Sequence, residues 1–468
     1  MRYVSTRGAA PVLDFEGVLL AGLARDGGLY VPETWPRQGE DFWRGLAGLP
    51  YHEVAARVMT PFVGHSLSPA ELSALTRDAY AGFRHEAVAP LVQMGPDRWM
   101  LELFHGQTIA FKDYALQLLG RLFDHFLAKR GRRIAVLGAT SGDTGSAAIE
   151  ACRDRAAIDI FILYPHGRVS DVQRRQMTTV PSQNVHAIAV DGSFDDCQDI
   201  VKALFNDHAF RDGVNLAAIN SINWARIIAQ TAYYAASAVA IGAPGRAVSF
   251  SVPTGNFGNV FAGYVAKQMG LPVNRFLIGT NRNDVISRFF NQGEMRLTPV
   301  EPSLSPSMDI QVSSNLERLL FELYDRDGAA LGQDLTRFRA ESRFTLSANA
   351  LTAARKEFAA IKVDDEATIA TMRRVHEETG QVIDPHSAIA QAATQSLGLA
   401  SDGPIISLAC AHPAKFPDAV IRATGITPTL PPHLAGLMTA EERVTRLPND
   451  PAAVAAYLSK ALVAGASA

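Results

Sequence analysis

Apolar and polar positions alternate in blocks between residues 133 and 206. Short runs rich in Ile, Val and Leu are typical of buried parallel strands, and the amphipathic blocks between them have helical spacing. These blocks predict strands at 134–137, 158–163 and 185–190, and helices at 146–155, 172–178 and 195–205. Strands that alternate with helices in this way predict a doubly wound parallel sheet.

A second set of strand-like runs lies further along the chain, at 247–252, 275–280 and, far downstream, 404–408. The sequence therefore predicts an α/β fold of two parallel-sheet lobes, one of them built from separated segments. Residues 331–377 are charged and helical in pattern, and we interpret them as a helical insertion in the larger lobe.

Length and composition exclude several classes of protein. A chain of 468 residues is too long for one compact core. With a net charge of −3 and no basic patch containing aromatic residues, we expect no nucleic-acid partner. The N-terminus lacks the apolar core of a signal peptide, and no apolar run reaches the roughly 18 residues that cross a bilayer, so we expect no membrane partner and a soluble, cytoplasmic protein. Three widely separated cysteines, Cys152, Cys197 and Cys410, suit a reducing compartment and predict no metal site.

One lysine lies in an unusual setting. Lys112 follows the apolar segment 104–111 and directly precedes a helical pattern. A lysine sheltered from water loses its preference for the charged form, so its amine can act as a nucleophile or base, as Schiff-base chemistry requires. For an arbitrary lysine the commoner explanation is an apolar stem along the surface with the ammonium in water.

Two glycine-rich loops, 138–145 and 253–259, each follow a predicted strand and precede a predicted helix. Backbone N–H groups and the positive end of the helix dipole converge at such a turn, which favours a bound phosphate or carboxylate. Neither loop has the P-loop or the dinucleotide-binding pattern. Taken alone, each is equally well explained as an ordinary tight turn.

With further motifs, these segments resemble a known family. The chain is similar to the threonine synthases, pyridoxal-phosphate enzymes of the tryptophan-synthase-β fold family, over most of its length. The matching segments are residues 3–8, 22–32, 104–114, both glycine-rich loops, 305–315, 384–387 and 411–417. The resemblance implies a lyase of threonine biosynthesis with pyridoxal 5'-phosphate as cofactor. It would convert O-phospho-L-homoserine and water to L-threonine and phosphate.

The resemblance also implies a division into domains. We expect an N-terminal domain at 1–85, a larger cofactor-binding lobe at 86–130 and 235–430, a smaller lobe at 131–234 and a C-terminal helical segment at 431–468. It does not distinguish a monomer from a homodimer.

Site residues follow from the same resemblance. Lys112 would bind the cofactor covalently and move protons, and the cofactor phosphate would lie on Gly255, Asn256, Phe257, Gly258 and Asn259. The substrate carboxylate would lie on the loop formed by Thr140, Ser141, Gly142, Asp143 and Thr144. The leaving phosphate would contact Asn220, Ser221 and Arg226.

Two of these assignments have open alternatives. The segment 220–226 could instead be a Ser-capped amphipathic helix with an exposed Arg226. Asp143 lies where related enzymes often have Asn near the phenolic oxygen of the cofactor, and a carboxylate there would repel that oxygen unless it were protonated or turned away.

The chain departs from the family pattern at two positions. Gln107 stands where the family usually has proline, and Cys410 stands where enzymes of this fold generally meet the pyridine nitrogen with a Ser or Thr hydroxyl. A thiol is a weaker donor and acceptor than a hydroxyl, and a small buried cysteine at a strand end is as common a structural residue.

Several questions stay open at this stage. His105, His386, His412 and Lys415 lie in the matching motifs without an assigned role. Alternative functions are a phospho-lyase that releases 2-oxobutanoate from the same substrate, or an inactive homologue that only binds pyridoxal phosphate.

Overall fold

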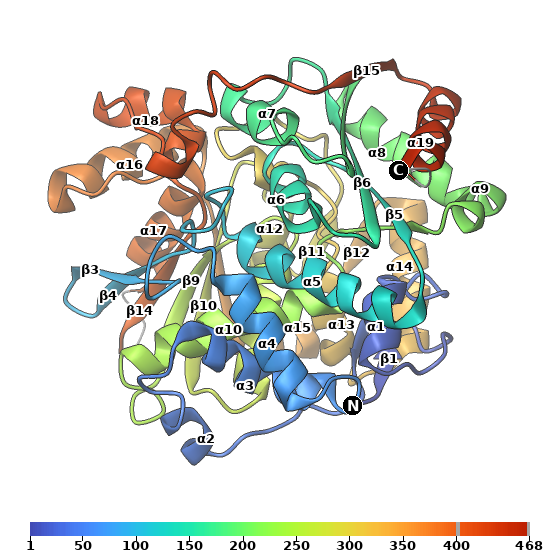
Figure 1. Cartoon of the computed structure of the whole chain (residues 1–468). Coiled ribbons are helices and arrows are strands. Elements are labelled where there is room, and N and C mark those ends of the chain that lie inside the picture. Colours follow the sequence, from blue (N-terminus) through green and yellow to red (C-terminus); the bar gives the residue numbers. More distant parts are fainter. Residues whose placement is uncertain (399–402, 466–468) are drawn as a thin grey trace. The chain divides into compact units, whose positions relative to one another are not determined.

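The computed structural model describes residues 1–398 and 403–465 (Figure 1). The chain forms two units, each built from two separate segments. The first contains Met1–Phe111 and Ser221–Pro428, and the second contains Lys112–Asn220 and Thr429–Ala468. We describe each unit by itself.

A five-stranded, fully parallel sheet forms the second unit, in the order β15-β7-β6-β5-β8. The strands expected from the apolar runs are present, and each extends one or two residues further. The C-terminal segment adds an edge strand that the sequence pattern did not predict. The strands are β5 (Ile134–Ala139), β6 (Ile158–Pro165), β7 (Val185–Asp191), β8 (Leu216–Ala217) and β15 (Thr445–Pro448).

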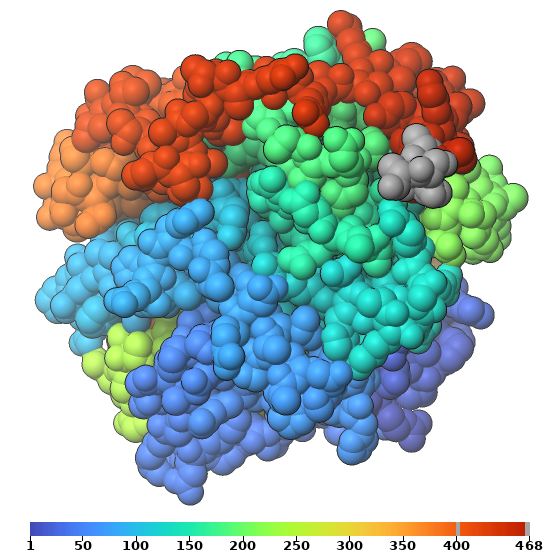
Figure 2. Space-filling view, in the orientation of Figure 1, coloured from blue at the N-terminus to red at the C-terminus, as the bar shows by residue number. Residues whose placement is uncertain are grey.

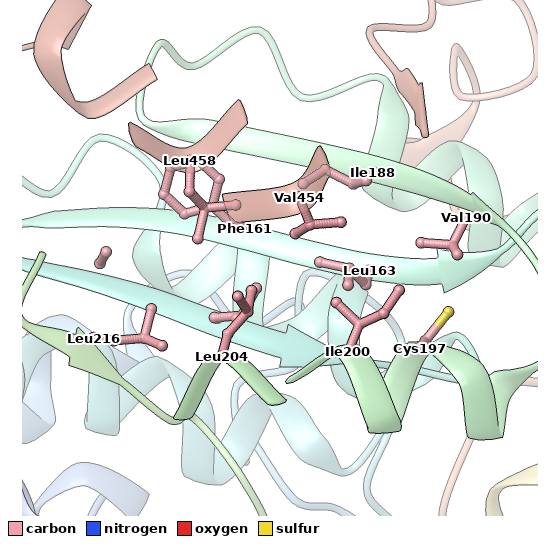
Figure 3. Close-up of a cluster of buried hydrophobic side chains, with 12 residues drawn as sticks. Phe161, Leu163, Ile188, Val190, Cys197, Ile200, Leu204, Leu216, Val454 and Leu458 are labelled. Atoms are coloured by element: carbon pink, nitrogen blue, oxygen red, sulfur yellow. The ribbon is translucent and has the colours of Figure 1, made fainter. Parts of the chain in front are cut away.

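Helices cover both faces of this sheet. They are α5 (Lys112–Arg130), α6 (Asp143–Cys152), α7 (Asp171–Thr178), α8 (Phe194–Asn206), α9 (His208–Gly213) and α19 (Pro451–Gly465), with the 3-10 turn η4 (Pro432–Leu434). On one face α8 and α19 enclose a fully apolar cluster in which Val454 and Leu458 pack near Phe161 and Ile188 (Figure 3). On the other face α6 lies against Ile162, whose side chain points to the opposite side of the sheet from Phe161 and Leu163, and α7 packs against α6. In the space-filling view the red C-terminal segment lies on the green residues of the same unit (Figure 2).

A six-stranded sheet forms the centre of the first unit, in the order β13-β10-β9-β14-β4-β3. All neighbours are parallel except the β3-β4 pair at one edge. The strands are β3 (Leu91–Gly95), β4 (Arg98–Glu102), β9 (Val248–Pro253), β10 (Val273–Thr280), β13 (Phe358–Lys362) and β14 (Ile405–Ala409). Two small antiparallel sheets pair β1 (Tyr3–Ser5) with β2 (Tyr30–Pro32) and β11 (Glu294–Arg296) with β12 (Arg343–Thr345).

The segment 331–377 is not entirely helical, which corrects the expectation of a helical insertion. It contains β12 and the edge strand β13 as well as helices. Strand β13 is only five residues long and follows a charged helix without a break, so its alternation of buried Phe358 and Ala360 with more exposed neighbours is too short to stand out in the sequence.

Helices pack on both faces of this sheet as well. Helix α17 contacts β9, β10 and β14, and Gly279 allows Ile389 to approach the strand closely. Helices α10 and α11 pack together, and α3 lies on α10. The helices are α1 (Phe15–Ala21), α2 (Glu40–Arg44), α3 (Tyr51–Val63), α4 (Pro69–Tyr80), α10 (Trp224–Ala240), α11 (Gly258–Gln268), α12 (Val285–Gln292), α13 (Leu316–Leu323), α14 (Gly328–Glu341), α15 (Ala348–Glu357), α16 (Asp365–Thr379), α17 (Pro385–Leu397) and α18 (Pro417–Thr424), with 3-10 turns η1 (Pro306–Met308) and η3 (Pro413–Lys415).

The two units divide the chain at points other than the domain boundaries expected from the sequence. Helix α5 packs against α6 and so belongs to the second unit, whereas α10 packs against α11 and belongs to the first. In the described part of the chain, no helix is both long enough and apolar enough to cross a membrane.

Candidate active site

Lys112 is the first residue of α5 and is only 8% exposed. Its Nζ lies 3.4 Å from Oδ2 of Asp143, at the first turn of α6. The sequence pattern indicated a sheltered lysine, and the structure adds a buried carboxylate as its partner. The carboxylate can hold the amine in place and exchange a proton with it.

Asp143 is held from its other side by α7. Gln173 donates from Nε2 to Oδ1 of Asp143 at 2.9 Å, while its own Oε1 accepts the N–H of Ser170 at 3.3 Å. Because the carbonyl end of the amide serves Ser170, the NH₂ end must face Asp143. The geometry leaves Oδ2 of Asp143 directed at Lys112.

The loop 140–144 is closely packed around its glycine. Gly142 has φ +136°, and a Cβ there would lie 2.4 Å from the Gln173 amide, so this position requires glycine. The Thr140 hydroxyl oxygen accepts the N–H groups of Gly142 and Gly145 at 3.0 and 2.9 Å. Two backbone donors are therefore used internally, whereas Ser141 and Thr144 are partly exposed.

In the first unit, the loop 253–259 joins β9 to the N-terminus of α11. Phe257 has a left-handed backbone with φ +60°, and its N–H donates to the Thr254 hydroxyl at 3.2 Å. The Ser313 hydroxyl donates to the Gly255 carbonyl oxygen at 2.7 Å. A Cβ on Gly255 would lie 3.1 Å from Met308 Cα. The result is a rigid, tightly packed turn at a helix N-terminus, which suits a phosphate.

Two tyrosine hydroxyls bind the side chain of Asn259, the last residue of this loop. The hydroxyls of Tyr233 and Tyr234 lie 2.6 and 2.9 Å from Asn259 Oδ1, and burial raises the pKa of Tyr234 well above its ordinary value, so that phenol stays a donor. Within the described residues, the buried Nδ2 of Asn259 has no hydrogen-bond partner. An unpaired buried amide donor fits a site that accepts an anion.

Arg226 lies in the first turn of α10 and is only 3% exposed. Asn223 caps this helix by accepting the N–H of Ala225 at 3.0 Å. The alternative of a Ser-capped helix with an exposed arginine is therefore wrong. Nε and Nη1 of Arg226 are buried without a partner among the described residues, and burial lowers the pKa of its guanidinium to about 10. A buried cation with unpaired donors calls for an anionic ligand.

Asn220 and Ser221, expected beside Arg226, are both partly exposed. The chain passes from the second unit to the first between them. The Ser221 carbonyl oxygen accepts a hydrogen bond from the Asn315 side chain at 3.1 Å.

Cys410 follows β14 and is 5% exposed. Its N–H donates to the Ser387 hydroxyl at 3.0 Å, and its carbonyl oxygen accepts the N–H of Phe111, the residue before Lys112, at 2.8 Å. Ser387 in turn donates to Asp384, which also contacts His386 Nδ1 at 2.7 Å. The backbone at Cys410 is thus fixed on both sides.

The other motif residues have local partners. Lys415 donates to the Thr108 carbonyl oxygen at 2.9 Å, and His105 Nε2 lies 2.7 Å from Glu102. His412 accepts the Ala414 N–H at 3.2 Å. The Gln107 amide packs so closely on Gly82 that a Cβ there would meet it at 2.2 Å.

Sequence reasoning assigned no role to three buried polar residues in or near these segments: Gln173, Asn315, which lies in the matching segment 305–315, and Arg318. Gln173 belongs to a Ser-x-x-Gln capping box, a signal that predicts a helix start but not a contact with Asp143. Arg318 occupies an amphipathic helix, where an arginine is normally on the surface.

Within the described residues, no group of three or more His, Cys, Asp or Glu side chains could hold a metal ion. Lys112 and the loop 140–144 belong to the second unit, and Arg226 and the loop 253–259 belong to the first. Their N–H groups, amides, amine and guanidinium are donors that suit phosphates and a carbonyl cofactor. Residues 93–411 match the sequence profile of the pyridoxal-phosphate dependent enzymes, so the chain belongs to that class.

Profile matches toward the two ends of the chain identify the family within this class. Residues 2–80 match the threonine synthase N terminus and residues 387–458 match the threonine synthase C-terminal profile. The chain belongs to the threonine synthase family.

Individual threonine synthases are similar to this chain over nearly the whole length of both proteins. Threonine synthase of Pseudomonas aeruginosa is 54% identical over 98% of this chain and 98% of its own. The crystal structure of threonine synthase from Brucella melitensis with bound pyridoxal phosphate is similar at a TM-score of 0.96 and 51% identity, covering 98% of this chain and 99% of that one. The yeast threonine synthase structure has a TM-score of 0.93 and 38% identity over 99% of both chains.

Proposed function

We propose that this chain is a threonine synthase that converts O-phospho-L-homoserine and water to L-threonine and phosphate. Membership of the family and the near-complete similarity to named threonine synthases support this activity. The observation that most supports a phosphorylated substrate is the burial of Arg226. A buried guanidinium with two unpaired nitrogens is suited to the phosphate of a phosphorylated amino acid.

Pyridoxal phosphate, when joined to an amino acid, withdraws electrons from the substrate carbons and so acidifies their protons. In our proposal Lys112 first holds this cofactor covalently. Its amine, once released, takes a proton from the substrate and returns it at another carbon. Asp143, 3.4 Å from the amine, orients it and stabilises its protonated form.

The cofactor phosphate would lie on Gly255, Asn256, Phe257, Gly258 and Asn259. The left-handed backbone at Phe257 and the close packing at Gly255 support this role, because they hold N–H groups in one arrangement at the start of α11. Cys410 would face the pyridine nitrogen, on a backbone fixed by Ser387 and Phe111.

The substrate would bind through its two anionic ends. The loop of Thr140, Ser141, Gly142, Asp143 and Thr144 would hold the carboxylate, chiefly through the hydroxyls of Ser141 and Thr144. Asn220, Ser221 and Arg226 would hold the leaving phosphate. No carboxylate among the described residues pairs with the Arg226 guanidinium. In this proposal the substrate phosphate is its counterion.

The partner we propose is therefore a small molecule, and the assembly is a monomer or a homodimer in the cytoplasm. The three cysteines lie in the described part of the chain, are buried and form no disulfide, in keeping with a reducing compartment.

One assay tests the proposal. The purified protein should absorb as a pyridoxal-phosphate enzyme and, with O-phosphohomoserine, release phosphate and threonine in equal amounts. Release of phosphate with 2-oxobutanoate would identify a phospho-lyase instead. An intact cofactor spectrum without phosphate release would identify an inactive homologue.

A further inference from the structure

Asn315 and Arg318 form a buried polar cluster at the start of α13 in the first unit. Both are 0% exposed. Neither belongs to the residues proposed above to touch cofactor or substrate, yet both contact the segments that do.

Asn315 joins two segments that lie far apart in the sequence. Its Nδ2 donates to the carbonyl oxygens of Ser221 and Asn256, both at 3.1 Å, and its backbone N–H donates to Asn256 as well, at 3.1 Å. An amide nitrogen has two hydrogens, so both are used. Ser221 belongs to the proposed substrate-phosphate segment and Asn256 to the proposed cofactor-phosphate loop. One side chain therefore sets the spacing between them.

Arg318 fixes the orientation of that amide. Its Nη1 donates to Asn315 Oδ1, so the amide nitrogen has to face the two carbonyl oxygens. Its Nη2 donates to the Ile222 carbonyl oxygen at 2.6 Å, and its Nε donates to the Tyr30 carbonyl oxygen at 3.0 Å. All three nitrogens are satisfied, which makes the cluster rigid.

Arg318 has no ion-pair partner of its own among the described residues. Its three hydrogen-bond acceptors are neutral, and the neighbouring carboxylate of Glu317, whose charge acts on Arg318, forms its ion pair with Arg7 at 3.0 Å. Its guanidinium lies 5.6 Å from the centre of the Trp224 ring, at the N-terminus of α10, where Arg226 is also buried. Two buried cations and a helix N-terminus together produce a strongly positive potential, which a dianion neutralises.

We propose that Asn315 and Arg318 are positioning residues for the substrate phosphate. Asn315 sets the distance between the substrate-phosphate segment and the cofactor-phosphate loop. Arg318 orients Asn315 and attracts the phosphate from behind the segment without touching it. This inference rests on the proposed function, since it takes the segments at Ser221 and Asn256 as the two phosphate sites.

The test uses the cofactor-loaded enzyme and four variants: Arg318→Lys, Arg318→Met, Asn315→Ser and, as a control, Asn184→Ser. Asn184 tethers its own loop in the same manner, by donating to the carbonyl oxygens of Cys152 and Ile158 at 2.9 and 2.8 Å, but it lies in the second unit. The measurements are kcat and KM for O-phosphohomoserine, the inhibition constant of inorganic phosphate, the dissociation constant of pyridoxal phosphate and the melting temperature.

Arg318→Met should raise KM and the phosphate inhibition constant together by about 10-fold while kcat changes less than about threefold, because the lost attraction acts on binding. Arg318→Lys should keep the charge, lose the fork geometry and recover most of that affinity. Asn315→Ser should weaken phosphate and pyridoxal phosphate together, each by about 5-fold, because it releases both segments. The control should lower only the melting temperature.

A purely structural role would lower the melting temperature in every variant and leave the phosphate inhibition constant within about twofold of the parent, which would overturn the proposal. Arg318→Lys keeps the buried charge and is the variant best able to fold. If Arg318→Met does not fold, an Asn315→Ser enzyme that keeps the parental phosphate inhibition constant and the parental affinity for pyridoxal phosphate, as the control does, overturns the proposal equally. If the parent turns over no O-phosphohomoserine, the proposed function fails, and the response of the melting temperature to inorganic phosphate still compares parent and variants.

Discussion

Replacing Arg226 with methionine should make the phosphate-free protein more stable while it lowers the activity. Methionine has a similar length, fits an apolar site and carries no charge. Burial lowers the pKa of the Arg226 guanidinium from its ordinary value to about 10, and this corresponds to a cost of roughly 3 kcal/mol for holding the charged form inside the protein. Because the folded-state pKa is below the unfolded one, that cost is fully present at any pH below about 10 and disappears only at higher pH, where the arginine of the unfolded chain is neutral as well.

The substitution should therefore stabilise the phosphate-free protein by about 1–3 kcal/mol, measured as a rise in the urea midpoint at pH 8. Inorganic phosphate should offset this difference in stability between variant and parent. At a concentration 100 times its dissociation constant, phosphate should stabilise the parent by about 2.7 kcal/mol and leave the variant unchanged. kcat/KM for O-phosphohomoserine should fall at least about 10- to 150-fold, the effect of losing one charge-assisted hydrogen bond.

A matched control is Arg44→Met. Arg44 is exposed and pairs with Glu40 and Asp41 at 2.6 and 3.1 Å on the surface of α2, so its loss should change stability by less than about 0.5 kcal/mol and should not alter the response to phosphate. The reasoning is refuted if Arg226→Met is less stable than the parent without phosphate and is still stabilised by phosphate to the parental extent.

Three further predictions concern the cofactor. Borohydride reduction and peptide mapping should locate the cofactor on Lys112, and Lys112→Ala should keep the fold, bind the cofactor only reversibly and lose turnover by several orders of magnitude; an adduct on Lys267 or Lys415 would contradict the assignment. Cys410→Ser should remain active, whereas Cys410→Val should impair turnover more than cofactor binding, and equal turnover of the two variants would make Cys410 a packing residue only. Gln173→Leu should lower kcat about 10-fold and shift the absorption spectrum of the bound cofactor, because Asp143 loses the donor at 2.9 Å that directs it to Lys112; Gln173→Glu should not restore the spectrum, and an unchanged spectrum in Gln173→Leu would show that Asp143 does not depend on this contact.

The alternating part of the fold was predictable because each element there carries its own signal. Strand β6 is buried along its whole length, and β5 and β7 each contain four consecutive buried residues, so their apolar runs are continuous in the sequence. The start of α6 was expected three residues too late, since the glycine-rich turn ends at Gly142 and not after Gly145. Strand β15 lacked a signal, because an edge strand with exposed Arg446 and Pro448 resembles a connector.

The parts of the candidate site that consist of contiguous motifs were predictable. The contacts between residues that lie far apart in the sequence were not. Glycine-rich turns after strands can be recognised from sequence alone, and so can an unusual lysine. The contact of Asp143 with Lys112 spans 31 residues, and that of Asn315 with Ser221 spans 94. The burial of Arg226 and Arg318 could not be read from their sequence neighbours, which are those of ordinary amphipathic helices. The free-energy cost of burying these two charges is offset by tertiary hydrogen bonds and, in our proposal, by ligands.

The parallel pairing of β15 with β7 has a consequence for biosynthesis of the chain. Strand β7 ends at Asp191, and its partner begins at Thr445, about 250 residues later. At typical rates of translation that interval is roughly 10 to 50 seconds. During this time the edge of β7 is unpaired, and the apolar cluster beneath α8 still awaits Val454 and Leu458 (Figure 3). A nascent chain of this protein therefore exposes an open strand edge and an apolar face until residues 445–458 have been synthesised, which makes the unfinished second unit a natural client for a chaperone.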